Sequence, residues 1–109
     1  MATSREYRDF IMEQLAGLKE LSCRPMMGEY LISYRGKVIG GIYDDRLLVK
    51  PTASAAAMMP EARREPPYDG AKEMLLVEEL ENREFLRELL LAVYDEVPAP
   101  KRKKKPRGR

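Results

Sequence analysis

Two pairs of turn-forming residues divide the middle of the chain into three short apolar segments. The segments are GEYLISY, KVIGGIY and RLLVKP, and they are separated by Arg35-Gly36 and by Asp44-Asp45. β-branched and aromatic residues favour strands, and such short turns join antiparallel neighbours. The sequence therefore predicts an antiparallel meander of three strands, which Pro51 ends because proline cannot donate a ladder hydrogen bond.

A helical pattern precedes the meander. Residues 4–20 carry one apolar stripe at helical spacing, and Thr3 with Glu6 fits a capping box at its start. An extended segment should begin near Pro25, because proline disfavours helical backbone at the residue before it. The helical stripe consists of Tyr7, Phe10, Ile11, Leu15 and Leu18.

Helical and strand patterns also follow the meander. Thr52 can cap a short helix over TASAAAMMP, and the stretch EARREPPYDG predicts a loop. KEMLLVEE predicts a fourth strand, whose continuous apolar run allows burial on both faces. Asn82 can cap a last helix. The stripe of that helix is Phe85, Leu86, Leu89, Leu90, Val93, Tyr94 and Val97.

The resulting order is α-β(3)-α-β(1–2)-α. Elements segregated in this way indicate an α+β fold, in which helices pack on an antiparallel sheet. We expect one domain over residues 1–97 and a disordered tail over residues 98–109, which have no apolar pattern.

The charge of the chain is unevenly distributed. The first 100 residues carry 13 basic and 18 acidic side chains, a net charge of −5, whereas the tail carries seven basic side chains and no acidic one. Such a tail can bind phosphates without sequence preference or can simply solubilise the chain, and the sequence leaves both open. The candidate nucleic-acid contacts are Lys101, Arg102, Lys103, Lys104, Lys105, Arg107 and Arg109.

Composition restricts where the protein works. The chain has 109 residues, of which 44% are hydrophobic, but no apolar run approaches the length of a membrane-spanning helix and no secretory signal opens the sequence. Cys23 is the single cysteine, so no internal disulfide can form. We therefore expect a cytoplasmic protein that does not contact a membrane.

Gly40 and Gly41 interrupt the middle segment of the meander. Glycine within a strand marks a bulge, a close approach of other backbone, or a ligand. The glycine spacing matches neither nucleotide-loop pattern, and the segment leads into another strand instead of a helix. We favour a bulge or close helix packing over a phosphate site.

The chain offers little catalytic chemistry. It contains no histidine, so a Cys-His pair and histidine metal ligands are excluded. Arg24 could lower the pKa of the neighbouring Cys23 thiol, but a small packed residue is the more common role. Adjacent acids such as Asp44-Asp45 are usual turn formers, and no acidic cluster has metal-loop spacing. We expect no catalytic residue, cofactor or metal.

Four tyrosines outside the helical stripes are the candidate partner-binding residues. Tyr30 and Tyr34 share strand parity and hence one face, and Tyr43 ends the neighbouring strand and could join them. Tyr68 lies in the predicted loop. Tyrosine clusters can anchor a partner, but they can equally cover a sheet while their hydroxyls stay in water, and we favour this second role.

Scattered positions over residues 4–96 resemble the N-terminal domain of the TfoX/Sxy family of bacterial competence regulators. The similar segments are RPMMGEYLISYRGKVIGGIYDDRLLVKP, with Arg24, Met26 and Gly28, and PPYDGAKEMLLVEEL, with Tyr68 and Met74. The resemblance implies an α-β(3)-α-β(2)-α fold and regulation alongside a transcription factor, with no catalytic residues to carry over. Long family members add a C-terminal helical domain, where this chain ends in a basic tail.

We therefore expect a non-enzymatic interaction or regulatory module. An unidentified protein would bind at the sheet tyrosines, and the tail would add weak nucleic-acid affinity. The sequence leaves the oligomeric state open, a homodimer included. The alternative is a small-molecule or enzymatic domain with a cleft near Gly40 and Gly41.

Overall fold

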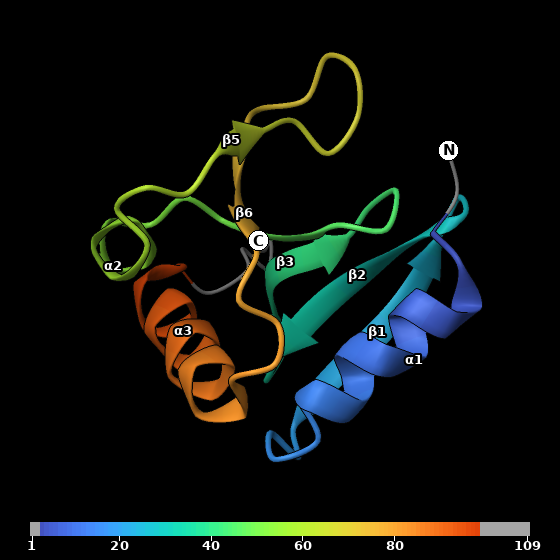
Figure 1. Ribbon diagram of the computed structural model, residues 1–109, viewed down its shortest axis with the longest axis horizontal. Coiled ribbons are helices and arrows are strands. Elements are labelled where there is room, and N and C mark those ends of the chain that lie inside the picture. Colours follow the sequence, from blue (N-terminus) through green and yellow to red (C-terminus); the bar gives the residue numbers. More distant parts are fainter. Residues whose placement is uncertain (1–2, 99–109) are drawn as a thin grey trace, which may run out of the picture.

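A computed structural model describes residues 3–98 as one antiparallel sheet with three helices (Figure 1). This arrangement confirms the predicted α+β class. The elements in chain order are α1 (Arg5–Gln14), β1 (Leu21–Met26), β2 (Glu29–Tyr34), β3 (Lys37–Ile42), β4 (Leu47–Val49), α2 (Ala53–Met58), β5 (Arg64–Glu65), β6 (Met74–Val77) and α3 (Arg83–Glu96).

The strand order in the sheet is β1-β2-β3-β4-β6-β5, and every neighbouring pair is antiparallel. Tight turns join β1 through β4 in sequence. Both predicted turns, Arg35-Gly36 and Asp44-Asp45, have positive φ at both residues, which is the geometry of type I′ hairpins. The predicted meander is therefore confirmed.

Two strands extend the sheet beyond the prediction. β1 begins at Leu21, four residues before Pro25, and pairs with β2 along its whole length. Proline is tolerated there because β1 is an edge strand, where an N–H can be missing from the outer side. β5 is only two residues long and lies in the predicted loop, so neither composition nor periodicity indicated it.

The first helix begins one residue later and ends earlier than the predicted span of residues 4–20. Ser4 is the N-cap, and its hydroxyl accepts a hydrogen bond from the backbone N–H of Tyr7. Thr3, the predicted cap, is buried and donates instead to Glu29 Oε1 at 2.7 Å. The helix stops at Gln14 and a turn follows.

The other two predicted caps are confirmed. Thr52 Oγ1 accepts from the N–H of Ala55 at 3.2 Å, and Asn82 Oδ1 accepts from the N–H of Phe85 at 3.0 Å. The side chain of Gln14 also donates to the carbonyl of Leu80, which ties α1 to the loop before α3.

All three helices cover one face of the sheet. In Figure 1, α1 lies across β1 and β2, and α2 lies beside α3. The core between the helices and this face includes Ile11, Leu15, Ile32, Ile39, Ile42, Leu47, Val49, Ala55, Leu75, Val77, Leu86, Leu89, Leu90 and Val93.

The strand register separates the two faces of the sheet. Ile32, Val49 and Leu75 point toward the helices and are buried in the core. The alternate cross-strand row, Leu31–Gly41–Leu48–Leu76, points to the opposite side. We call that side the far face, and in the described part of the chain no helix covers it.

The glycine pair has a packing role, and its neighbours are strands. The β2–β3 register shifts between Ile32 and Ser33, so a bulge lies beside Gly40, as predicted. A Cβ on Gly40 would lie 2.4 Å from the carbonyl oxygen of Leu48. The atoms nearest to both glycines belong to neighbouring strands and to Tyr43, so the close approach that the structure shows comes from these groups.

Candidate functional site

The four candidate tyrosines do not form one cluster, because the sheet separates them into two pairs. Tyr30 and Tyr34 share the helix-covered face, as predicted. Tyr43 lies on the far face and does not join them, because it shares strand parity with Gly41. It stands instead beside Tyr68, with ring centroids 6.4 Å apart and an interplanar angle of 59°.

Helix side chains occupy the surroundings of the first pair. The Arg8 guanidinium lies over the Tyr30 ring, 5.1 Å from its centroid. Tyr34 packs edge-to-face on Tyr94, with centroids 5.0 Å apart. These contacts stabilise the packing of α1 and α3 on the sheet. Packing between the sheet and the helices is therefore enough to explain why Tyr30 and Tyr34 are present.

Gly41 explains how the Tyr43 ring can approach the backbone of β3 on the far face. A Cβ at Gly41 would be 2.5 Å from the Tyr43 ring and 2.7 Å from the Tyr30 carbonyl oxygen. Tyr43 is 5% exposed, whereas Tyr68 is 60% exposed. Burial raises the pKa of the Tyr43 hydroxyl, and the nearby Tyr68 and Glu29 raise it further. The phenol is therefore protonated at neutral pH.

A groove of about 600 Å³ adjoins this tyrosine pair on the far face. Side chains from β1, β2, β3 and β6 form its floor, and the segment before β6 forms one wall. Most of the lining is apolar, and two lysines and one glutamate provide the charge. We call it the far-face groove; its lining is Met26, Leu31, Val38, Gly40, Tyr43, Lys50, Pro51, Pro67, Tyr68, Ala71, Lys72, Glu73 and Met74.

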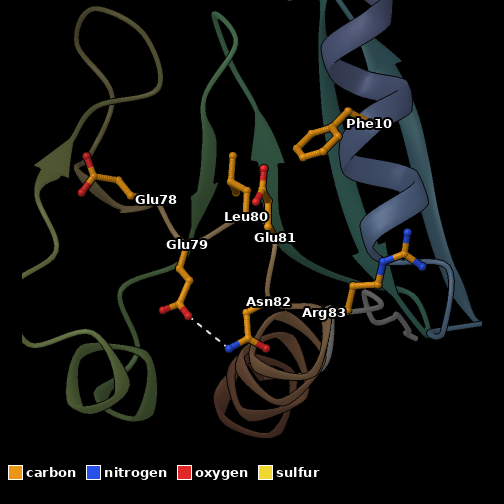
Figure 2. A pocket seen from close by; sticks show the side chains of 7 residues that line it. All are labelled: Phe10, Glu78, Glu79, Leu80, Glu81, Asn82 and Arg83. Atoms are coloured by element: carbon orange, nitrogen blue, oxygen red, sulfur yellow. Dashed lines mark hydrogen bonds between the residues drawn. The ribbon is translucent and has the colours of Figure 1, made fainter.

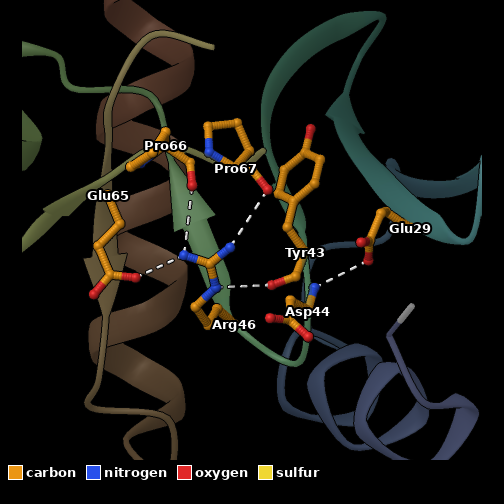
Figure 3. A network of polar contacts seen from close by, with 7 residues as sticks. All are labelled: Glu29, Tyr43, Asp44, Arg46, Glu65, Pro66 and Pro67. Carbon is orange, nitrogen blue, oxygen red and sulfur yellow. Dashed lines mark hydrogen bonds and ion pairs between the residues drawn. The ribbon is translucent and has the colours of Figure 1, made fainter. Parts of the chain in front are cut away.

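Arg46 holds the wall of this groove against the sheet (Figure 3). Its guanidinium pairs with Glu65 at 2.6 Å and donates to the carbonyls of Pro66 and Pro67 at 3.5 and 3.4 Å. Its Nε donates to the Tyr43 carbonyl at 3.1 Å. One side chain thus joins the β3–β4 turn to the proline segment that leads to the exposed tyrosine.

A second polar network fastens the start of α1 to the same end of the sheet. The Asp44 N–H donates to Glu29 Oε1 at 3.0 Å, which also accepts from the Thr3 hydroxyl. The Ser4 N–H donates to Asp45 Oδ1 at 2.8 Å. The two aspartates therefore stabilise the β3–β4 turn and its contact with the start of α1, in agreement with their interpretation as turn formers.

Cys23 has no catalytic environment. Burial raises the pKa of its thiol, and Arg8, not the adjacent Arg24, opposes that shift. The side chain of Arg24 lies on the other face of β1, because its register partner is Leu31. A thiol with a raised pKa is a weak nucleophile at neutral pH.

A hollow of about 840 Å³ lies where the β6–α3 loop meets α1 (Figure 2). Its carboxylates, Glu78, Glu79 and Glu81, point in different directions, and Glu79 accepts a hydrogen bond from Asn82 at 3.1 Å. Across residues 3–98, no group of three metal-ligating side chains is placed to hold a metal ion. This hollow is an acidic surface depression with no converging chemistry.

Two sequence expectations remain, one on the tail and one on membrane contact. The tail contacts, from Lys101 to Arg109, lie outside the described residues. Within the described residues, no helix has both the length and the apolar composition needed to cross a bilayer.

Several residues of the far-face groove were not predicted as site residues. Leu31 and Met74 lie in strands and Lys50 directly follows β4, and the faces of these strands could be paired only after the register was known. The sequence signal that could have placed Lys50 was the alternation of side chains along a strand. Leu48 and Lys50 are two residues apart and therefore share a face. Arg46 gave no signal, since its partners are backbone carbonyls and a distant glutamate.

The fold and the groove together define a small α+β domain with one helix-covered sheet face and one open face. The TfoX N-terminal domain family matches residues 13–94, and the chain belongs to this family, as the sequence resemblance predicted. A relative from Spirochaeta aurantia, described as an uncharacterized 12.7 kDa protein in the trpE 5′ region, is 30% identical over 105 residues. That match covers 95% of this chain and 91% of the relative. No solved structure matches the chain.

Proposed function

We propose that the protein is a non-enzymatic regulatory module of the cytoplasm, which binds a partner protein through the far-face groove. The observation that carries the proposal is the apolar groove on the face that no described helix covers, beside the 60% exposed Tyr68. Exposed apolar surface rimmed by polar groups is typical of protein interaction sites. The family membership supports a regulatory role, and neither the family nor the relative has a name that indicates an enzyme.

The chemistry of the chain also supports a non-enzymatic role. There is no histidine in the sequence, and the single thiol has a raised pKa. A general base needs a pKa near the working pH and hydrogen-bond reach of the proton that it removes. The titratable side chains that line the far-face groove are two lysines, one glutamate and two tyrosines, of which Tyr43 is buried.

A site-specific photocrosslinker tests this proposal. We would place p-benzoylphenylalanine at Tyr68 and, as a matched control, at Glu88, an exposed position of α3 on the helix-covered side. A protein adduct in native cell extract at position 68, absent at position 88 and lost on Leu31→Glu, is the expected result. Equal adducts at both positions, or none at position 68, would place the interaction elsewhere.

A small-molecule site is the second candidate function, because the groove reaches Gly40 and has a suitable size. Its volume of about 600 Å³ lies within the range of about 300–1,000 Å³ typical of small-ligand pockets. A thermal-shift screen with pooled metabolite classes would support this candidate if one class raises the melting temperature and Leu31→Glu removes the effect.

The basic tail supplies a separate proposed activity, which is weak nucleic-acid binding without sequence preference. Seven basic side chains oppose a net charge of −5 on the first 100 residues. If the tail neutralises about five phosphates, the log-log salt slope should be about −4 to −5. Fluorescence anisotropy on two unrelated duplexes, with the full chain and a chain ending at Pro100, tests this. Preferential binding of one duplex by the shortened chain would instead show base readout by the folded domain.

A further inference from the structure

The far-face groove is lined by residues from several strands, and its extent across the sheet bears on what can occupy it. Its floor takes side chains from β1, β2, β3 and β6, and Lys50 follows β4 on the same face, so it crosses five neighbouring strands. Adjacent strands are about 4.8 Å apart, which makes the groove roughly 19 Å long across the sheet. An extended chain of about five or six residues has that length.

The charge along this groove is basic. Lys50 and Lys72 line it, and among residues 3–98 neither is a member of an ion pair. Arg24 lies on the same face, opposite Leu31 in the register, and is exposed. The one acidic lining residue is Glu73. An apolar floor beside unpaired ammonium groups complements a ligand that combines apolar side chains with a carboxylate.

Single-stranded nucleic acid also combines flat apolar groups with negative charge, but this groove suits it less well. Nucleic-acid platforms stack successive bases on successive aromatic rings. Here Tyr68 is exposed and Tyr43 is only 5% exposed, while the rest of the floor is aliphatic or thioether, as at Leu31 and Met74. Such a floor accommodates aliphatic or aromatic side chains of a peptide.

We infer that the far-face groove binds an extended peptide segment of about five or six residues, in which bulky apolar side chains lie beside an acidic residue that pairs with Lys50 and Lys72. This inference rests on the proposed partner-binding function and specifies the chemistry of the partner. The apolar side chains enter the floor between Met26, Leu31 and Met74. The carboxylate lies at the rim near the two ammonium groups.

Selection from a random dodecapeptide library displayed on phage, against the full chain, tests the inference. The expected peptides share an aspartate or glutamate within two positions of leucine, isoleucine, phenylalanine or tyrosine. A labelled synthetic copy should bind about tenfold more weakly to the Lys50→Glu, Lys72→Glu double variant, because reversing both charges turns two modest surface attractions into repulsions. The matched control is Lys19→Glu with Arg87→Glu, which makes the same charge change at exposed positions outside the groove.

The outcomes separate this inference from the proposed function. If Leu31→Glu abolishes peptide binding but the lysine variant does not weaken it, the groove is the site and the acidic requirement is wrong. If neither groove variant weakens binding, both the inference and the proposed site are wrong. Circular-dichroism melting verifies that each variant folds. If the double variant does not fold, the Lys72→Glu variant, which changes only an exposed position, replaces it in the binding experiment.

Three other results would also overturn the inference. One is a selection that yields no peptides, or only peptides without an acidic residue. Another is tighter binding of labelled oligo(dT) than of any selected peptide, with loss on Lys50→Glu, which would make the groove a nucleic-acid site. The third is a dimer in sedimentation velocity that the lysine variant dissociates, which would make a second copy of the chain the occupant.

Discussion

The two faces of the sheet are made from alternate residues of the same strands, yet they differ in what they do. On one face, Ile32, Val49 and Leu75 are at most 2% exposed beneath three helices. On the other, Leu48 is fully buried at the centre, but Leu31 and Leu76 are only half-buried, and the Tyr43 ring and the proline segment provide partial cover. The comparison teaches that stability is concentrated on the covered face, which leaves the open face available for binding.

The largest expected difference is between two adjacent leucines of β6. Leu75→Ala removes a side chain buried under the helices and should lower the free energy of unfolding by about 2–5 kcal/mol. Leu76→Ala, on the far face, should cost less than about 1.5 kcal/mol. Urea unfolding of both variants measures the difference. Equal losses would show that the far face is a second core and not an open surface.

The second prediction concerns the contact that gives the far face its partial cover. Gly41→Val should lower the free energy of unfolding by about 1–3 kcal/mol, because the new side chain overlaps the Tyr43 ring and the Tyr30 carbonyl. Gly17→Val is the control, since a Cβ at Gly17 meets nothing within 4 Å. Unchanged urea unfolding of the Gly41 variant would remove the close-approach argument.

The third prediction tests the wall of the groove. Arg46→Met keeps the aliphatic packing but removes the ion pair with Glu65 and the donors to the proline carbonyls, at a cost of about 1–2 kcal/mol. Amide exchange after the prolines, in residues 68–73, should also become faster. Arg64→Met changes an exposed neighbouring arginine and should leave both quantities unchanged. Exchange that stays slow in the Arg46 variant would mean that the wall does not depend on this side chain.

The smallest expected effect lies on the covered side, where Glu96 of α3 joins the start of α2. Its carboxylate accepts from the Ser54 hydroxyl at 2.6 Å and from the Ser54 N–H at 3.0 Å, and these bonds lower the pKa of Glu96. A glutamate has an unfolded-state pKa of about 4.3, and the stabilisation by the Glu96–Ser54 hydrogen bonds is fully present above that pH. It is lost as the pH falls through the lower pKa of Glu96 in the folded state. Exchange of the Ser54 amide should accelerate over that acidic range relative to its intrinsic rate. In Glu96→Gln this extra acceleration should vanish, and its persistence would assign the pH dependence to another group.

Local patterns predicted the parts of the fold that depend on neighbouring residues. The turns at Arg35-Gly36 and Asp44-Asp45 and the caps at Thr52 and Asn82 were all predicted, because backbone preference and side-chain reach act within about three residues. β1 was placed too late in the chain and β5 was missed, because each is stabilised by a partner strand and not by its own composition.

The tyrosines show where prediction of the site stopped. Parity placed Tyr30 and Tyr34 on one face, but it did not show that α1 and α3 would occupy their surroundings. The bulge beside Gly40 adds one residue to β3, and this shift in parity cannot be read from residue spacing alone. Tyr43 was therefore grouped with the wrong pair.

The sequence by itself determined the α+β class, the tight hairpin turns, the family and the contrast between an acidic body and a basic tail, since these follow from local preference and composition. Only the tertiary structure decided which face of the sheet the helices cover. It also decided that Tyr43 and Tyr68 meet on the far face with Lys50 and Lys72 nearby, and that Arg46 holds the wall of the groove beside them. The physical reason is that a face is chosen by the burial of many side chains together, and the side chains left on the other face become neighbours only once that choice is made.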